Sequence, residues 1–305
     1  MSISVIPFEA GQACLDWLGL CDALEAGHAL PKAEIADTFL YRGGDTLLTR
    51  SAWIDGMGIA VKSATIFPDN NAANLPTING GMNLYSDADG ILQAVVDFHL
   101  VTKWKTAGDS LLGALKLAPP SVANILIVGA GTVAASLVEA FGAGFPDASF
   151  TVWNRSPEGA RALAARFEAV TPVDDLAKAV EAADIILTAT MSSEPVIKGD
   201  WLRGGQLLNM IGAYRPDMRE ADDTALRKGQ IFVDSRDTTI GHIGEIEIPL
   251  QAGVITRDDI LGDFYDIAGF SPCGPDEIRI FKNGGGAHLD LMTGRYIFDR
   301  WNAAG

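Results

Sequence analysis

Hydrophobic and polar residues alternate through residues 38–99, as in the segments TFLYR, TLLTRSAWI, GIAVKSATIF and GMNLYSDADGILQAVVDF. Alternation with a period of two predicts strands, which Gly and Asp-Gly turns separate here. Apolar residues recur at helical spacing around residues 10–27 and again over residues 100–117, which predicts a helix at each place. Pro119 and Pro120 end the second helix, because proline lacks the amide hydrogen that a helix needs, and they mark a domain boundary.

Beyond the two prolines, strand-like and helix-like segments take turns along the chain. The segments NILIVGA and SFTVWN are typical of strands, whereas TVAASLVEAFGAG and PEGARALAARFEAV are typical of helices. Short apolar runs at 183–190, 205–213 and 229–235 predict further strands. This pattern predicts an α/β fold with a Rossmann-type, doubly wound parallel sheet.

The last segment, residues 287–301, has the spacing of a helix, and we expect it to pack back onto the first part of the chain. The sequence therefore predicts two domains. One is the Rossmann domain over residues 119–286. The other is a discontinuous α+β domain of residues 1–118 together with 287–305.

Composition excludes several classes of partner. A formal net charge of -16 disfavours nucleic acid and anionic membranes, because phosphate binding needs a basic surface. The three cysteines form no CxxC pair, and no metal-binding motif is present, so we expect neither disulfides nor a metal. No secretion signal or long apolar run is apparent, and we expect a cytoplasmic protein without membrane contact.

A glycine-rich motif follows the strand segment ILIV and precedes a helix. It has the form GxGxxA and consists of Gly129, Ala130, Gly131, Thr132, Val133 and Ala134. In this context the glycines allow a tight turn, and a pyrophosphate can lie on the first amides of the helix. The other interpretation is a purely structural glycine turn. We predict a dinucleotide site.

The end of the next strand bears on the choice of cofactor. An NAD site usually has Asp or Glu there, whereas SFTVW ends in Asn154, Arg155 and Ser156. A guanidinium and a hydroxyl can bind the 2′-phosphate of NADP(H). Arg155 as a solvated surface charge is the alternative. We expect a preference for NADP(H), with NAD(H) possible.

Several motifs together resemble a known family. VKSATIFPDN, LPTING, VTKWKTAGDS, VGAGTVA, WNRSPE, TATMSSEP, GAYRPDMRE, VDSR and FKNGGG occur in the order seen in the ornithine cyclodeaminase and mu-crystallin family, over about residues 30–300. This family joins ornithine cyclodeaminases, bacterial alanine dehydrogenases, reductases of cyclic imines such as Δ1-pyrroline-2-carboxylate, and mu-crystallin. Mu-crystallin is a ketimine reductase that also binds thyroid hormone. The resemblance implies substrate binding and a homodimer interface in the first domain.

The resemblance assigns substrate contacts to two residues of the first domain. Lys62 lies on the strand face of Ala60 and Ala64, where a lysine is either a guard against edge pairing or a buried cation. In the family this motif holds a lysine that binds the substrate carboxylate and interacts with its nitrogen. Thr77 of LPTING matches a substrate-contacting threonine, although alone it is only a turn residue.

Lys105 departs from the family pattern, in which most relatives have an arginine that binds the substrate carboxylate. Lysine keeps the charge and loses the bidentate fork. Asp109, one helical turn further on, either orients the ammonium or forms an exposed pair with it worth about 0.3–0.5 kcal/mol. Arg50 precedes the strand of Lys62 and is a candidate to replace the missing fork.

The remaining candidates lie in the second domain. Tyr214 stands where ornithine cyclodeaminases have an aspartate that activates the nucleophilic amine, so the cyclisation machinery is absent, and Tyr214 either donates a proton or lines the nicotinamide pocket. His242, between glycines, is either a general acid or an ordinary loop residue. The predicted cofactor contacts also include Thr190, Met191 and Gly212.

These features predict an NADPH-dependent reductase of a small cyclic imino acid. The product is L-proline from Δ1-pyrroline-2-carboxylate or L-pipecolate from Δ1-piperideine-2-carboxylate. Three alternatives stay open: an enzyme like alanine dehydrogenase, an ornithine cyclodeaminase, and a non-catalytic protein that binds NADPH and a ligand.

Overall fold

The computed structural model describes residues 3–305 and divides the chain into two compact units. The first unit is discontinuous and consists of Met1–Lys105 with Gly286–Gly305, and the second is Thr106–Gly285. The division comes earlier than the two prolines, inside helix α3 (Phe98–Leu117). The reason is packing: in the later half of α3 the carbonyl of Ser110 accepts a hydrogen bond of 2.8 Å from Asn209, a residue of the second unit.

The first unit contains a six-stranded sheet in the order β1-β6-β5-β4-β3-β2, antiparallel except where β1 pairs with β6. Its strands are β1 (Ser4–Ile6), β2 (Glu34–Arg42), β3 (Asp45–Ile54), β4 (Gly58–Ile66), β5 (Ile78–Tyr85) and β6 (Leu92–Asp97). Its other elements are α1 (Phe8–Gln12), α2 (Trp17–His28), the 3-10 helix η1 (Pro68–Ala73) and α10 (Ala287–Ala304).

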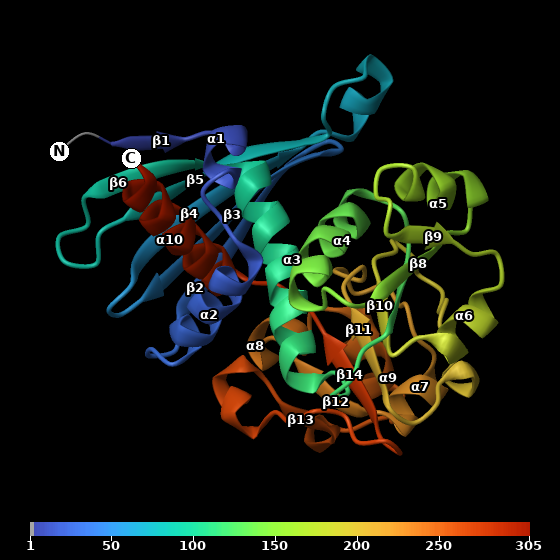
Figure 1. Ribbon diagram of the computed structural model, residues 1–305. Coiled ribbons are helices and arrows are strands. Elements are labelled where there is room, and N and C mark those ends of the chain that lie inside the picture. The colour runs from blue at the N-terminus through green and yellow to red at the C-terminus, as the bar shows by residue number, and fades with distance from the viewer. Residues whose placement is uncertain (1–2) are drawn as a thin grey trace. The chain divides into compact units, whose positions relative to one another are not determined.

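Helix α10, drawn in red in Figure 1, lies against the strands of this sheet although most of the sheet precedes it by about two hundred residues. Close approach is possible because Gly294 has no side chain: an added Cβ would lie 2.0 Å from the side chain of Met82 on β5. On β4 every second residue from Gly58 to Ala64 is buried, which matches the period of two seen in the sequence. The strands predicted within residues 38–99 are thus present.

The second unit has an eight-stranded parallel sheet in the order β13-β12-β14-β11-β10-β7-β8-β9. Its strands are β7 (Asn124–Val128), β8 (Ser149–Trp153), β9 (Val170–Pro172), β10 (Ile185–Thr188), β11 (Gln206–Met210), β12 (Gln230–Val233), β13 (Ile260–Gly262) and β14 (Ile278–Lys282). Its helices are α4 (Thr132–Gly144), α5 (Pro157–Ala164), α6 (Leu176–Ala182), α7 (Asp223–Lys228), α8 (Arg236–Thr239) and α9 (Gly244–Gln251), with 3-10 helices η2 (Gly199–Trp201), η3 (Arg257–Asp259) and η4 (Phe264–Gly269). The predicted doubly wound α/β fold is confirmed.

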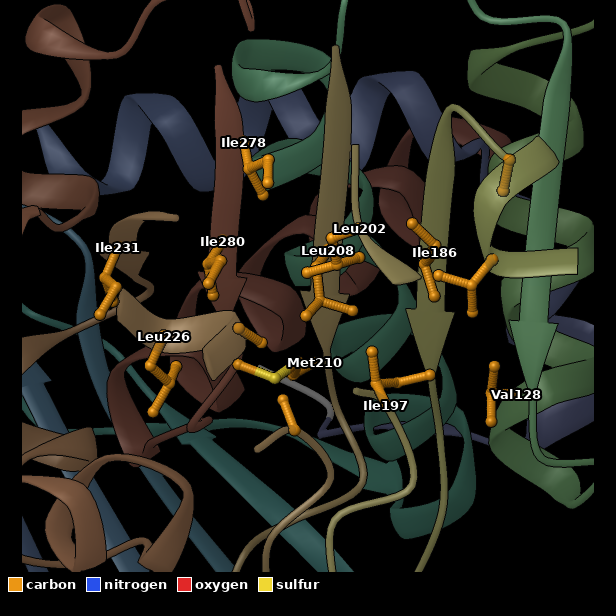
Figure 2. Close-up of a cluster of buried hydrophobic side chains, with 14 of the residues drawn as sticks. Val128, Ile186, Ile197, Leu202, Leu208, Met210, Leu226, Ile231, Ile278 and Ile280 are labelled. Atoms are coloured by element: carbon orange, nitrogen blue, oxygen red, sulfur yellow. The ribbon is translucent and has the colours of Figure 1, made fainter. Parts of the chain in front are cut away.

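The central strands of the second sheet are buried, so they form the main core of this unit. Figure 2 shows side chains from neighbouring strands in one apolar layer, among them Val128, Ile186, Leu208 and Ile280. Burial on both faces explains why these strands appear in the sequence as short continuous apolar runs rather than as alternating ones.

The order of the strands determines where a ligand is expected to bind. From β7 the chain continues to β8 and β9 on one side, and then returns to β10 and β11 on the other side of β7. In open α/β sheets ligands bind beyond the carboxyl ends of the strands at such a reversal. A ligand is therefore expected at the loops that follow β7, β10 and β11.

Candidate functional site

The loop between β7 and α4 has the geometry of a dinucleotide-binding turn. Gly129 has a φ of +112°, and an added Cβ would lie 2.6 Å from the carbonyl oxygen of Ala189, so this position needs glycine. Gly131 is the N-cap of α4, with no side chain that caps the helix, and an added Cβ would meet nothing within 4 Å. The first amides of α4 and the open space beside Gly131 fit a pyrophosphate group.

The segment after β8 lies beside this turn. An added Cβ at Gly159 would lie 2.7 Å from Asn154 Nδ2 and 3.6 Å from the Cβ of Ala130. Asn154 Nδ2 donates to the carbonyl of Ser156 at 2.9 Å, which holds the segment in a tight turn. Arg155 is exposed, and within residues 3–305 its side chain has no hydrogen bond or ion pair.

The hydroxyl of Ser156 is already engaged. It donates to the carboxylate of Glu158 at 2.9 Å. A backbone hydrogen bond, followed by this bond from Ser156, lowers the pKa of Glu158. Arg161 lies 3.6 Å from the same carboxylate. Of the predicted phosphate ligands, Arg155 is therefore the one whose donors are available without rearrangement.

The loops after β10 and β11 are joined by one buried carboxylate. Glu220 Oε1 accepts hydrogen bonds from the amide and the hydroxyl of Thr190, both at 2.7 Å. Its Oε2 accepts from the amides of Gly212 at 2.7 Å and Ala213 at 3.3 Å. Gly212 also lies so close to Thr190 that an added Cβ would be 1.9 Å from the Thr190 carbonyl oxygen. The neighbouring Met191 is 73% exposed.

In the first unit Lys62 is a buried cation. Its residue is 6% exposed, on an interior strand of the sheet, so it does not protect an edge. Its ammonium donates to Asp290 Oδ1 at 2.7 Å and lies 5.0 Å from the centre of the Phe98 ring. Burial lowers the pKa of Lys62, and Asp290 opposes this shift. Burial opposes the ionisation of Asp290, but Lys62, followed by Lys105 and Arg50, outweighs it and lowers the pKa.

Two further cations lie in this unit, and they differ in their partners. Arg50 pairs with Lys62 across β3 and β4, and its guanidinium binds both carboxylate oxygens of Asp37 at 2.8–3.1 Å. Lys105 is 8% exposed and has no hydrogen bond or ion pair in the described part of the chain. Asp109 is fully buried, so the alternative of an exposed pair with Lys105 is wrong. Lys105 is the cation best placed to receive an anion.

Three predicted residues are still to be placed. Thr77 is partly exposed, and its carbonyl accepts a hydrogen bond from the amide of Phe67 at 2.8 Å. Tyr214 is 56% exposed, with the guanidinium of Arg215 5.6 Å from its ring. His242 is exposed in a turn after α8. Within residues 3–305 no hydrogen bond connects the side chains of these three with the other candidates, and their roles stay predictions.

Asp290 and Glu220 are not among the residues predicted from the sequence. Asp290 had a usable signal, because an acidic residue between Leu289 and Leu291 interrupts the apolar run of the last helix. Glu220 had none: it follows Arg219 in a polar segment, and only the fold shows that its carboxylate is buried.

Other properties of the described chain bear on the class of protein. None of its helices has the length and apolar character needed to cross a membrane. No group of three or more His, Cys, Asp or Glu side chains in residues 3–305 could hold a metal ion.

Comparison with known proteins identifies the family. Residues 51–305 match the model of the ornithine cyclodeaminase/mu-crystallin family. The chain is 48% identical over 291 residues to a Δ1-pyrroline-2-carboxylate reductase of Paracoccus denitrificans, with 93% of this chain and 92% of the relative covered. It is 30% identical to the ketimine reductase mu-crystallin of Mus musculus, with 80% and 77% covered.

A solved structure shows the same fold. The Δ1-pyrroline-2-carboxylate reductase of Thermococcus litoralis, determined with NADH and L-proline, has a TM-score of 0.90, 23% identity, and coverage of 99% of this chain and 98% of that one. The family model covers most of the chain, including both the buried Lys62 and the glycine turn. The chain therefore belongs to the ornithine cyclodeaminase/mu-crystallin family.

Proposed function

We propose that this protein is an NADPH-dependent reductase of small cyclic imino acids, with Δ1-pyrroline-2-carboxylate as the first substrate and its six-membered homologue as the second. The observation that carries the proposal is the 48% identity to a Δ1-pyrroline-2-carboxylate reductase over nearly the full length of both chains. The cationic groups of the first unit support it, since an imino acid brings a carboxylate and a basic nitrogen.

Lys105, Lys62 and Arg50 have separate tasks in this proposal. Lys105 binds the substrate carboxylate, because it has no protein anion of its own in residues 3–305. Lys62 interacts with the ring nitrogen, and Asp290 orients it through the bond of 2.7 Å. Arg50 is held by Asp37 and adds positive charge without offering its fork to the substrate. Fixing the substrate in this way lowers the barrier by orientation and charge stabilisation.

The reaction consumes one imine, one reduced cofactor and one proton, and it yields a cyclic amino acid and the oxidised cofactor. When bound, the nicotinamide supplies a hydride to the imine carbon. The electron pair of the C=N bond moves to the nitrogen, which takes its proton from the Lys62 ammonium. Burial lowers the pKa of Lys62 and so eases this transfer. Solvent then returns a proton to the Lys62 amine.

We propose a preference for NADPH over NADH that depends on Arg155. In the Arg155→Ala variant we expect kcat/KM to fall about tenfold with NADPH and to stay unchanged with NADH, because one charge-assisted hydrogen bond at an exposed site is lost. Arg166→Ala, which removes another exposed arginine of the second unit, is the matched control. Equal losses with both cofactors would show that Arg155 does not bind the 2′-phosphate.

We also propose a homodimer formed through the first unit. All nine residues of the edge strand β2 are exposed, including Phe39, Leu40 and Tyr41 at 49%, 67% and 73%. An exposed apolar edge strand invites pairing with another chain. Light scattering should give a dimer for the native protein and a shift toward monomer for Tyr41→Glu. Leu261→Glu, at an exposed position of the second unit, should leave the dimer intact.

The cytoplasm is the compartment that we propose, because the chain has three cysteines, an odd number, with no CxxC pair, and this suits a reducing compartment.

The function is tested by measuring NADPH oxidation with purified protein. The substrates are Δ1-pyrroline-2-carboxylate, its six-membered homologue, and pyruvate with ammonia, each repeated with NADH. Fast turnover of a cyclic imine establishes the reductase and its ring preference. Turnover only with pyruvate and ammonia would indicate an alanine dehydrogenase instead. Ammonia release from ornithine, measured in a separate assay, would indicate a cyclodeaminase. Tight NADPH binding with no turnover would leave a binding protein.

A further inference from the structure

A buried group of charged residues lies beneath the loops after β10 and β11. Glu220 accepts four hydrogen bonds from these two loops through its two oxygens. Its own amide donates to Glu245 Oε2 at 2.6 Å, and the amide of Ala221 donates to Glu245 Oε1 at 3.1 Å. Both glutamates are fully buried. A chain of hydrogen bonds thus runs from the first turn of α9 to the loops at the end of the sheet.

Negative charge dominates this group. Two buried cations lie near it. The ammonium of Lys282 on β14 donates to the carbonyls of Met210 at 3.0 Å and Asn283 at 2.7 Å. The guanidinium of Arg219, next to Glu220 in the chain, donates to Asp223 at 2.8 Å. Burial lowers the pKa of Lys282. Four carboxyl groups oppose this shift, those of Glu220, Glu245, Asp234 and Asp109. Burial, followed by the charge of Glu220, raises the pKa of Glu245 to about 7. Four carboxyl groups thus act on the ammonium of Lys282.

The loops above this group belong to the second half of the doubly wound sheet. The first half, built from β7, β8 and β9, has the glycine turn and Arg155, which suit a pyrophosphate and an adenosine ribose phosphate. In this fold the two halves of a dinucleotide bind to the two halves of the sheet. The nicotinamide end is thereby assigned to the loops that follow β10 and β11, which include Thr190 and Gly212.

We propose that Glu220 is a positioning residue for the nicotinamide. Its hydrogen bonds hold both loops in place, and its buried negative charge favours the oxidised, cationic ring over the reduced, neutral one. The inference rests on the proposed function, because it presumes a nicotinamide cofactor. Its consequence is that the protein assists hydride donation by stabilising the charge that appears on the ring.

The decisive quantity is the ratio of two dissociation constants, that of NADP+ divided by that of NADPH, measured by calorimetry or fluorescence without substrate. Glu220→Gln removes the charge at nearly constant shape, and we expect the ratio to rise about threefold or more because NADP+ loses a favourable interaction that NADPH lacks. Glu181→Gln removes an exposed carboxylate of α6 and should leave the ratio unchanged.

A second variant separates the charge from the hydrogen bonds. Thr190→Val deletes one donor to Glu220 and keeps the carboxylate. It should weaken the binding of both cofactor forms by a similar factor, with the ratio unchanged. A purely structural role for Glu220 would give this same result in Glu220→Gln, and that outcome would overturn the proposal.

The native protein offers a test that does not depend on the folding of Glu220→Gln. Between pH 6 and pH 8 Glu245 changes from mostly protonated to mostly ionised, since burial raises its pKa to about 7. The added negative charge should lower the ratio as the pH rises, and Glu245→Gln should remove this trend. A ratio that does not depend on pH would contradict the electrostatic role. Failure of the native protein to bind either form would contradict the proposed function instead.

Discussion

Replacing Lys62 with methionine should lower kcat/KM for Δ1-pyrroline-2-carboxylate by about 10²- to 10³-fold, the usual cost of losing one preorganised donor at a reacting group. Methionine has a similar length and is apolar, so it fills the same space and supplies neither charge nor proton. Steady-state NADPH oxidation measures the effect. A variant that keeps more than about a tenth of the native kcat/KM would show that Lys62 has no part in the chemistry.

The same substitution should also destabilise the protein, which must be separated from the loss of activity. Without Lys62, the carboxylate of Asp290 remains buried at 1% exposure and loses its one hydrogen bond in residues 3–305, because Oδ2 has none. Removing one partner of a buried ion pair costs about 3–5 kcal/mol. Lys62→Met/Asp290→Asn removes the stranded charge, so it should regain much of the thermal stability and none of the activity.

The position of Lys62 on the sheet was accessible from the sequence, but its partner was not. Alternation places Lys62 with Ala60 and Ala64 on one strand face, and all three are buried. The bond to Asp290 joins residues 228 positions apart, and no local pattern specifies which helix covers the sheet. For the same reason the contact of Arg50 with Asp37 could not be predicted, because it depends on the register of β2 and β3.

In the second unit, too, a local feature was predictable from the sequence and a distant contact was not. The glycine motif is local, because a turn between a strand and a helix needs only neighbouring residues to form, and its position was predicted correctly. Glu220 acts through hydrogen bonds to residues 8 and 30 positions away, and it becomes recognisable only when β10 and β11 are adjacent. The domain boundary was predicted at Pro119 because proline ends α3, whereas the packing of Ser110 places the division within the helix.

Two alanine substitutions in the glycine turn should separate folding from cofactor binding. Gly129→Ala places a methyl group 2.6 Å from the Ala189 carbonyl at a φ of +112°. Such a strained position costs about 1–3 kcal/mol, and the displaced loop should lower NADPH affinity by about 100-fold. Thermal unfolding of the apoprotein and NADPH titration should therefore both change.

Gly131→Ala is the more informative change. The φ of Gly131 is -84°, which alanine adopts readily, and an added Cβ meets no protein atom within 4 Å. The apoprotein should lose less than about 1 kcal/mol, the cost of a weaker N-cap. A pyrophosphate on the first amides of α4 would occupy that open space, so NADPH affinity should still fall at least about tenfold. Unchanged affinity with a stable apoprotein would mean that the dinucleotide does not approach this turn, because the protein itself leaves room for the methyl group.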